Sequence, residues 1–124
     1  FLSLKKSKVN VRYGPSFDSK IKYIYKKINL PIKQIDQKEN FRRIVDLKNN
    51  SGWIHVSQVK KSNSIIILED KILYKKPSNF SKPIAKLEKG RLLVLKKCEN
   101  IWCNVKTDDY SGWVKTENIW GSIK

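Results

Sequence analysis

The sequence repeats one short motif 60 residues apart. Ser51–Ile54 (SGWI) in the first half returns as Ser111–Val114 (SGWV) in the second, and each copy follows a Pro-Ser turn at a similar distance. Self-similarity at a fixed period indicates duplicated structural modules. We therefore expect two domains, residues 1–62 and 63–124, joined by a short polar linker.

Hydrophobic and polar residues alternate in both halves, which is typical of short β-strands. Runs of Gly, Pro, Ser, Asn and Asp separate the alternating stretches and predict turns. Residues 19–28 have some helical character, but their β-branched and aromatic side chains favour a strand with an irregular loop. The predicted fold class is all-β. The expected strands include residues 8–12, 31–35, 54–56, 65–68, 91–95 and 113–115.

The small size of each half limits the functions that we expect. A unit of about 60 residues buries only about 60% of the surface of its unfolded chain, which leaves little spare stability. A deep pocket is not expected in so small a core, so the size favours a binding surface over an enzyme. The sequence also lacks an apolar run of about 18 residues, so we expect no membrane span.

The chain is strongly basic, with 27 Lys and Arg against 11 Asp and Glu, a net charge of +16. An anionic partner is the direct inference. Residues 1–62 carry 15 basic and 4 acidic side chains, whereas residues 63–124 carry 12 and 7. Most of the net positive charge therefore lies in the first half. The alternative is a solvated, lysine-rich surface of the kind that an AT-rich genome produces, because Lys greatly outnumbers Arg.

Cys98 and Cys103 are the two cysteines, and four residues separate them. In a hairpin with a four-residue loop, the flanking positions face each other at a Cα distance that a disulfide can bridge. We expect this disulfide, which would contribute about 2 kcal/mol and would imply an oxidising compartment. The alternative is a pair of buried thiols in a reducing compartment. Two Cys and one His are too few for a zinc site.

Both halves contain a set of characteristic motifs. They are Lys8–Ser16, Leu30–Ile32, Phe41–Ile44 and Gly52–His55 in the first half, and Cys98–Val105, Gly112–Val114 and Trp120–Gly121 in the second. These motifs resemble the bacterial SH3-like (SH3b) domain of exported bacterial proteins, and the second half resembles a more divergent copy. The resemblance covers essentially the whole chain and implies two tandem SH3-like β-barrels. It also implies a ligand class, which is peptide-bearing cell-wall material or a periplasmic protein.

The turn after the first alternating strand differs between the copies. In the first copy, Asn10 is expected to bond to nearby backbone groups, and Gly14 suits a positive φ. The second copy has Ile72 and Lys76 at these places. If this turn shapes a ligand groove, the second groove is altered or absent, and the second domain serves chiefly as a stabilising partner.

The repeated SGW motif is expected to be structural first. Gly52 and Gly112 are interpreted as turn residues that precede Trp53 and Trp113. An indole ring buries a large area, and each core is too small to be closed by aliphatic side chains alone. We therefore expect both Trp side chains to complete the cores, with any ligand contact secondary.

No arrangement of residues in the sequence indicates catalysis. His55 is the single histidine, and nothing in its spacing pairs it with a cysteine and a third orienting group. The acidic pairs Asp108-Asp109 and Glu69-Asp70 lie in expected turns and do not resemble an acid/base pair in a cleft. A glycine-rich phosphate loop and a metal-ligand cluster are also missing from the sequence. We expect a non-enzyme without cofactor or metal.

Binding is therefore the expected activity, and aromatic side chains in loops and turns are its best candidates. Tyr13 and Tyr25 are the preferred surface residues because polar residues lie nearby on both sides of each of them. The alternative is that half or more of the aromatics complete the two cores. The candidate ligand residues are Arg12, Tyr13, Tyr25, Trp53, Tyr74, Tyr110 and Trp113.

Three functions compete at this point. The first is a periplasmic or secreted module that binds peptidoglycan stem peptides or an envelope protein. The second is a small basic barrel that binds nucleic acid, which the dispersed charge and the expected disulfide disfavour. The third is a secreted scaffold that binds extended protein segments. The chain begins at Phe1 and contains no Met, so we expect residues upstream of it, such as a cleaved signal peptide.

Overall fold

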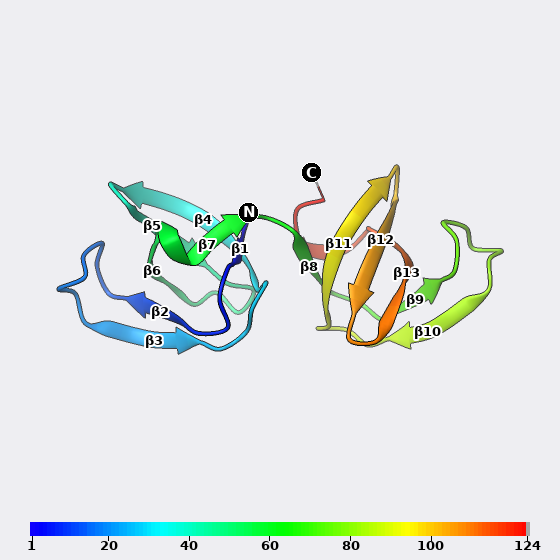
Figure 1. Cartoon of the computed structure of the whole chain (residues 1–124), viewed down its shortest axis with the longest axis horizontal. Coiled ribbons are helices and arrows are strands. Elements are labelled where there is room, and N and C mark those ends of the chain that lie inside the picture. The colour runs from blue at the N-terminus through cyan, green and yellow to red at the C-terminus, as the bar shows by residue number, and fades with distance from the viewer. Residues whose placement is uncertain (124) are drawn as a thin grey trace. The chain divides into compact units, whose positions relative to one another are not determined.

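The computed structural model describes residues 1–123, and its regular secondary structure is almost entirely short strands. Its contacts divide the chain into two compact units, Phe1–Ser62 (unit 1) and Asn63–Lys124 (unit 2). Figure 1 shows unit 1 in blue to green and unit 2 in green to red. Among the described residues, no helix has the length and apolar character needed to cross a membrane.

Unit 1 is a seven-stranded antiparallel sheet with a single turn of 3-10 helix. The strand order is β3-β2-β6-β5-β4-β1-β7, so β2 and β6 are neighbours although they are far apart in sequence. The elements are β1 (Leu2–Leu4), β2 (Val9–Arg12), β3 (Ile21–Tyr25), β4 (Pro31–Lys38), β5 (Phe41–Val45), β6 (Ser51–His55), η1 (Val56–Gln58) and β7 (Val59–Lys61).

Unit 2 repeats this architecture. Its strand order, β10-β9-β13-β12-β11-β8-β14, matches that of unit 1 strand for strand. The all-β prediction and the duplication are therefore confirmed, as is the strand expected within residues 19–28. The strands are β8 (Ser64–Ile67), β9 (Lys71–Tyr74), β10 (Pro83–Leu87), β11 (Leu92–Glu99), β12 (Trp102–Thr107), β13 (Tyr110–Lys115) and β14 (Ile119–Gly121).

The clustered side chains of both cores are almost all aliphatic, and neither Trp53 nor Trp113 belongs to these clusters. Trp113 is nevertheless buried, as expected, whereas Trp53 is only half-buried. Ile54 and Val114, which follow the two Trp residues, are fully buried members of the cores. Successive side chains of a strand point to opposite faces. Each indole therefore lies on the outer face of its sheet, where Trp53 is half-buried and Trp113 is buried. The core of unit 1 consists of Leu4, Val9, Val11, Ile32, Ile44 and Ile54.

Gly52 and Gly112 lie inside strands β6 and β13, not in turns as predicted. Both are needed because a neighbouring strand passes very close. A Cβ on Gly52 would collide with the side chain of Val11 and lie 3.1 Å from the carbonyl oxygen of Arg12. A Cβ on Gly112 would lie 2.7 Å from the carbonyl oxygen of Tyr74. The repeated glycine therefore permits the contact between β2 and β6 and between β9 and β13.

Gly14 also has a different role from the predicted one. Its φ is not positive, and a Cβ there would lie 2.7 Å from the hydroxyl oxygen of Ser19. The loop after β2 is tight because its two sides approach closely at this point.

The predicted disulfide between Cys98 and Cys103 is present. The two residues lie opposite each other in the pairing of β11 with β12, with Cα atoms 4.0 Å apart. Glu99 and Trp102 also pair across this hairpin, so the turn itself is shorter than the four residues expected. Cys103 is fully buried in the core of unit 2.

We predict that Gly52→Ala destabilises unit 1 by about 1–3 kcal/mol, because the added methyl group overpacks the contact with β2. Urea denaturation followed by circular dichroism measures the change. Lys33→Ala, at an exposed position on β4, is the control and should leave the midpoint unchanged. A midpoint for Gly52→Ala equal to that of the wild type would show that β2 and β6 can move apart without a loss of stability.

We predict that replacing both cysteines by Ala destabilises unit 2 by about 2 kcal/mol, since a short cross-linked loop restricts the unfolded chain only modestly. Hydrogen exchange resolved by residue should show faster opening in β11 and β12, whereas the amides of unit 1 keep their protection. Equally faster amide exchange in both units would contradict the conclusion that the disulfide stabilises unit 2 alone.

Candidate binding groove

Unit 1 contains a surface groove with a volume of about 380 Å³, which we call groove 1. It lies where β2, the loop after β2, the end of β6 and η1 come together. β2 lies beside β6 because Gly52 admits it, so the groove follows from the same close contact that shapes the sheet. The residues that line groove 1 are Lys8, Asn10, Arg12, Phe17, His55, Ser57 and Gln58.

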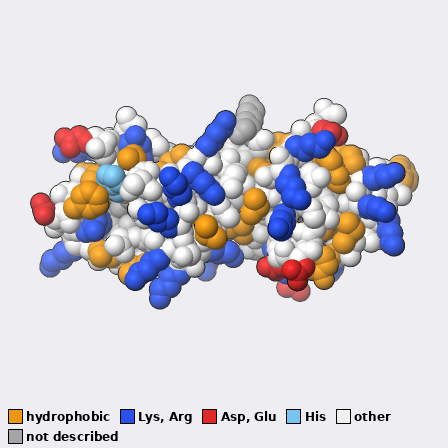
Figure 2. Space-filling model, viewed as in Figure 1, with side chains coloured by type: hydrophobic (Ala, Val, Ile, Leu, Met, Phe, Trp, Pro, Cys, Tyr) orange, Lys and Arg blue, Asp and Glu red, His pale blue; other side chains and the backbone are white. Residues whose placement is uncertain are grey.

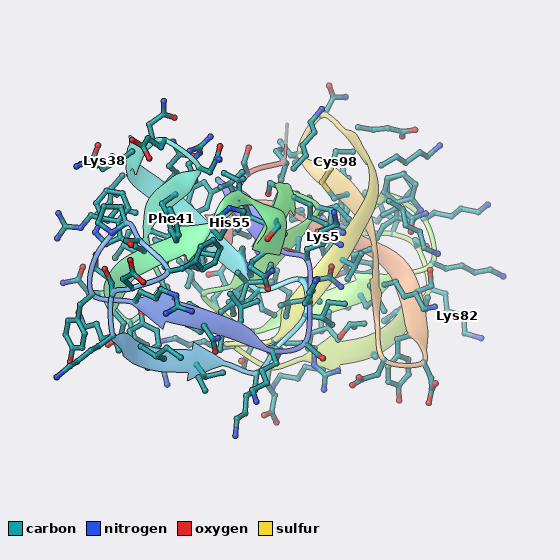
Figure 3. All side chains as sticks on the ribbon, turned by 60° about the vertical axis from the view of Figure 1, so that its left-hand side comes forward. Lys5, Lys38, Phe41, His55, Lys82 and Cys98 are labelled. Carbon is teal, nitrogen blue, oxygen red and sulfur yellow. A yellow bond between two sulfur atoms is a disulfide. The ribbon has the colours of Figure 1, made fainter. Side chains whose placement is uncertain are left out.

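Three rings form an aromatic cluster at groove 1. The ring centroids of Phe17 and His55 are 4.8 Å apart, and Phe41 contacts both rings edge to face at 5.2 Å. Phe41 and His55 pair across β5 and β6, and Figure 3 shows them close together. Phe41 is buried, whereas Phe17 is 63% exposed and therefore presents its ring to solvent.

Arg12 is held rigidly at the edge of this cluster. One of its terminal nitrogens, Nη1, donates hydrogen bonds to the carbonyl oxygens of Phe17 (3.1 Å) and Ser19 (2.9 Å). The guanidinium carbon also lies 5.6 Å from the centre of the Phe17 ring. Within the described residues, Nε and Nη2 make no hydrogen bond, so a fixed pair of donors is left for a ligand.

His55 caps the 3-10 turn and is oriented by it. The backbone N–H of Ser57 donates to Nδ1 of His55 at 3.2 Å. A backbone amide can only donate, so Nδ1 is an acceptor and the neutral ring carries its proton on Nε2. The Ser57 hydroxyl is 2.8 Å from the same Nδ1. This serine–histidine contact belongs to the cap, and no carboxylate among residues 1–123 is hydrogen-bonded to the ring as an orienting group.

Unit 2 has a groove at the corresponding place, with a volume of about 210 Å³, which we call groove 2. Strand register gives the correspondence, because Arg12 pairs with Trp53 as Tyr74 pairs with Trp113. The expectation that the second groove is altered is therefore correct, but the groove is not absent. Its lining residues are Glu69, Asp70, Lys71, Ile72, Tyr74, Asn79, Lys115 and Glu117.

Groove 2 has one aromatic lining residue, Tyr74, which packs against the buried Trp102. Tyr74 and Trp102 meet edge to face with centroids 5.7 Å apart, and the ammonium of Lys115 lies 5.7 Å from the centre of the Trp102 ring. Trp102 and Lys115 pair across β12 and β13 as Phe41 and His55 do in unit 1. Both units therefore keep aromatic and basic side chains at the same positions of the fold.

The bacterial SH3 domain family matches the sequence twice, at residues 5–61 and 70–121. The chain belongs to this family. Each match falls within one unit, so the resemblance to a tandem SH3b protein is confirmed.

Among solved structures, this tandem bacterial SH3 chain is similar to NlpC2 from Trichomonas vaginalis, with 10% sequence identity and a TM-score of 0.46 over 98% of this chain and 47% of that one. It is also similar to NlpC1 from the same organism, with 9% identity and a TM-score of 0.44 over 95% and 44%. The chain spans about half the length of these two structures. No curated protein matches it significantly.

Two of the residues selected from the sequence line a groove of their bacterial SH3 domain. Arg12 lines groove 1 and Tyr74 lines groove 2. Tyr13 and Tyr110 are exposed, at 66% and 46%, but line neither groove. Lys22 lies 5.5 Å from the centre of the Tyr13 ring.

Trp53 and Trp113 also lie outside the linings of the two grooves. Each pairs across the sheet with a residue that does line one, Arg12 or Tyr74. Lys97 lies 5.8 Å from the centre of the Trp113 ring. These indoles therefore support the strands that carry the groove residues.

Tyr25 is a structural residue rather than the surface residue predicted. Its side chain is half-buried against the core, and its hydroxyl donates to Oδ2 of Asp46 at 2.9 Å and lies 3.1 Å from the hydroxyl of Tyr23. Asp46 in turn accepts from the backbone N–H groups of Lys48 and Asn50. The phenol thus ties β3 to the turn between β5 and β6. The sequence neighbours of Tyr25 were a poor guide, because Ile24 lies on the opposite face of β3 and Lys26 lies beyond the end of the strand.

The sequence interpretation did not select His55 and Asn10 as lining residues of groove 1, nor Phe41 beside His55. Phe41 and His55 come together through strand pairing, and Asn10 faces the groove from within β2 instead of shaping a turn. The alternation of Asn10 and Arg12 with the buried Val9 and Val11 was the available signal, because it places both polar side chains on one outer face.

Charges in groove 2 are engaged within unit 2. Lys71 is buried, and its ammonium donates to the carbonyl oxygen of Glu117 at 2.6 Å and pairs with Glu69 at 3.4 Å. A hydrogen bond from Asn118, followed by the contact with Lys71, lowers the pKa of Glu69. Asp70 pairs with Lys86 at 3.7 Å. Within residues 1–123, no cluster of His, Cys, Asp and Glu has the grouping of a metal site.

We predict that Tyr25→Phe lowers the stability of unit 1 by about 1 kcal/mol, the contribution of one hydrogen bond. Burial, followed by the hydrogen bonds to Tyr23 and Asp46, raises the pKa of the Tyr25 phenol well above its ordinary value. The unfolded phenol ionises above about pH 10 while the folded one stays protonated, so the wild type loses stability as pH rises further. Tyr25→Phe should reduce this loss. Urea midpoints of both proteins at pH 9 and pH 11 measure this loss. An equal loss of stability in the wild type and in Tyr25→Phe would contradict the prediction.

Proposed function

We propose that this protein is a non-catalytic binding module of the bacterial cell envelope that recognises peptidoglycan stem peptides or an envelope protein. Groove 1 is the observation that carries the proposal. It combines exposed ring surface at Phe17 with a rigid cationic donor at Arg12, and the rest of its lining is polar. Aromatic rings supply contact area at low entropic cost, and a fixed arginine suits a carboxylate.

Family membership supports a binding function, since bacterial SH3 domains are generally non-catalytic binding domains. The Cys98–Cys103 disulfide supports a periplasmic or secreted location, because such bonds persist in oxidising compartments. Groove 1 is also shallow enough to take an extended peptide from either source, glycan-linked or protein. A protein partner with an extended segment therefore remains within the same proposal.

Nucleic acid is a poorer fit to the surface. On the face seen in Figure 2, Lys and Arg side chains are spread over both units and do not gather into one stripe. Groove 2 is lined by Glu69, Asp70 and Glu117, which would repel a phosphate backbone. An aromatic groove that tracks single strands needs continuous positive charge, which the lining of groove 2 does not provide.

We predict that the protein pellets with purified sacculi at low salt, and that Phe17→Ala weakens this binding by about tenfold, the effect of removing one exposed aromatic anchor. Phe80→Ala is the matched control, because Phe80 is fully exposed in the corresponding loop of unit 2 and lines neither groove. Phe80→Ala should pellet as the wild type does.

Pelleting assays that recover no protein at low salt would remove the wall-binding form of the proposal. Capture of the same protein by a solubilised envelope protein, lost in Phe17→Ala and kept in Phe80→Ala, would then support the second form. Equal binding by both variants would exclude groove 1 as the site.

A further inference from the structure

The two grooves occupy the same place in the fold but carry opposite charges. Lys8, directly before β2, corresponds to Asp70, directly before β9. Ser57, two residues after His55, corresponds to Glu117, two residues after Lys115. Groove 1 is lined by two basic side chains and no acidic ones, whereas groove 2 is lined by three acidic and two basic ones. The duplication thus kept the place of the site in the fold and changed its charge.

Groove 1 presents donors whose positions are fixed. The two carbonyl contacts of Arg12 use Nη1, which leaves the Nε and Nη2 hydrogens as a parallel pair. This pair matches the two oxygens of a carboxylate. The cap on Nδ1 of His55 leaves its Nε2–H as a further donor, and Lys8 adds a mobile positive charge.

Groove 2 offers an anion no comparable donor. Lys71 is engaged with Glu117 and Glu69, and Lys115 lies over the Trp102 ring. The position of Arg12 is taken by Tyr74, which supplies one neutral hydroxyl. A carboxylate entering groove 2 would therefore meet three negative side chains and, apart from the lone ammonium of Lys115, no available cation.

We propose that groove 1 binds a carboxylate group of the ligand, with small apolar groups of the ligand against Phe17 and His55, and that groove 2 rejects this group. Only unit 1 of the tandem therefore recognises the anion. The inference rests on the proposed function for its peptide ligand, but it concerns the charge that groove 1 selects and the unit that selects it. The small volume of groove 1 favours a short, small-residue segment over a bulky one.

The test uses the whole chain and the probe N-acetyl-alanyl-alanine, in its L,L and D,D forms, with the matching C-terminal carboxamides. Amide chemical shifts followed by NMR report the site and the affinity together. We expect the acid to shift the amides of Asn10, Phe17 and Ser57, and to leave the groove 2 amides of Ile72, Asn79 and Glu117 in place. The carboxamide should bind about tenfold more weakly or not at all, because it cannot accept two charge-assisted hydrogen bonds.

Two substitutions separate the charge from the fold. Arg12→Gln removes the donor pair but also loosens the loop that Arg12 holds, so Lys8→Gln, at an exposed position outside that loop, is the second variant. Both should weaken binding of the acid, Lys8→Gln by about threefold as expected for one exposed charge. Asp70→Asn, at the position in unit 2 that corresponds to Lys8, is the control and should leave the affinity unchanged.

Several outcomes would overturn the inference. These are equal affinity for acid and carboxamide, shifts of similar size in both grooves, no shifts with any form of the peptide, and no effect of Lys8→Gln. Inorganic phosphate is titrated alongside, and tighter binding of phosphate than of the acid would replace a carboxylate with a phosphate as the ligand group. If sacculi fail to pellet the protein while the acid binds groove 1, the wall-binding form of the proposed function falls and this inference stands. If pelleting depends on Phe17 while acid and carboxamide bind equally, only this inference falls.

Discussion

The structure depends on how closely β2 approaches β6, and β9 approaches β13. Gly52 and Gly112 make this approach possible, because any larger residue would place a carbon atom inside the neighbouring strand. The consequence reaches the surface. With β2 against β6, Arg12 and Trp53 become register partners, and the loop after β2 carries Phe17 onto the ring of His55. A backbone constraint inside the sheet thus builds the groove on its outer face.

Strand alternation divides the work between core and groove. Val9, Val11 and Ile54 point inward and close the hydrophobic core, so Asn10, Arg12 and His55 point outward by necessity. Unit 1 therefore acquires a polar and aromatic surface from the same strands that stabilise it. Strand β12 has a similar double role in unit 2, because Cys103 enters the core and its neighbour Trp102 packs against Tyr74, which lines groove 2.

Period, alternation and cysteine spacing were sufficient to predict an all-β tandem repeat with a disulfide, because these signals are local or repeat along the chain. Groove 1 was harder to predict because its residues are brought together by non-local pairing. Phe41 meets His55 only once β5 and β6 are in register, and Tyr25 was misplaced because its bond to Asp46 spans 21 residues. The role of Gly52 was likewise invisible in the sequence, since the atoms that exclude a side chain there belong to β2.

Duplication explains how two similar units can differ in charge at no cost to the fold. The core positions keep aliphatic residues in both copies, as Ile54 and Val114 illustrate, because a cavity or an unpaired polar group there would cost several kcal/mol. Exposed charges contribute little to stability. The difference between Lys8 in unit 1 and Asp70 in unit 2 therefore costs little stability. It nevertheless turns the attraction of an approaching carboxylate into repulsion. Selectivity can diverge between the copies wherever stability does not depend on the residue.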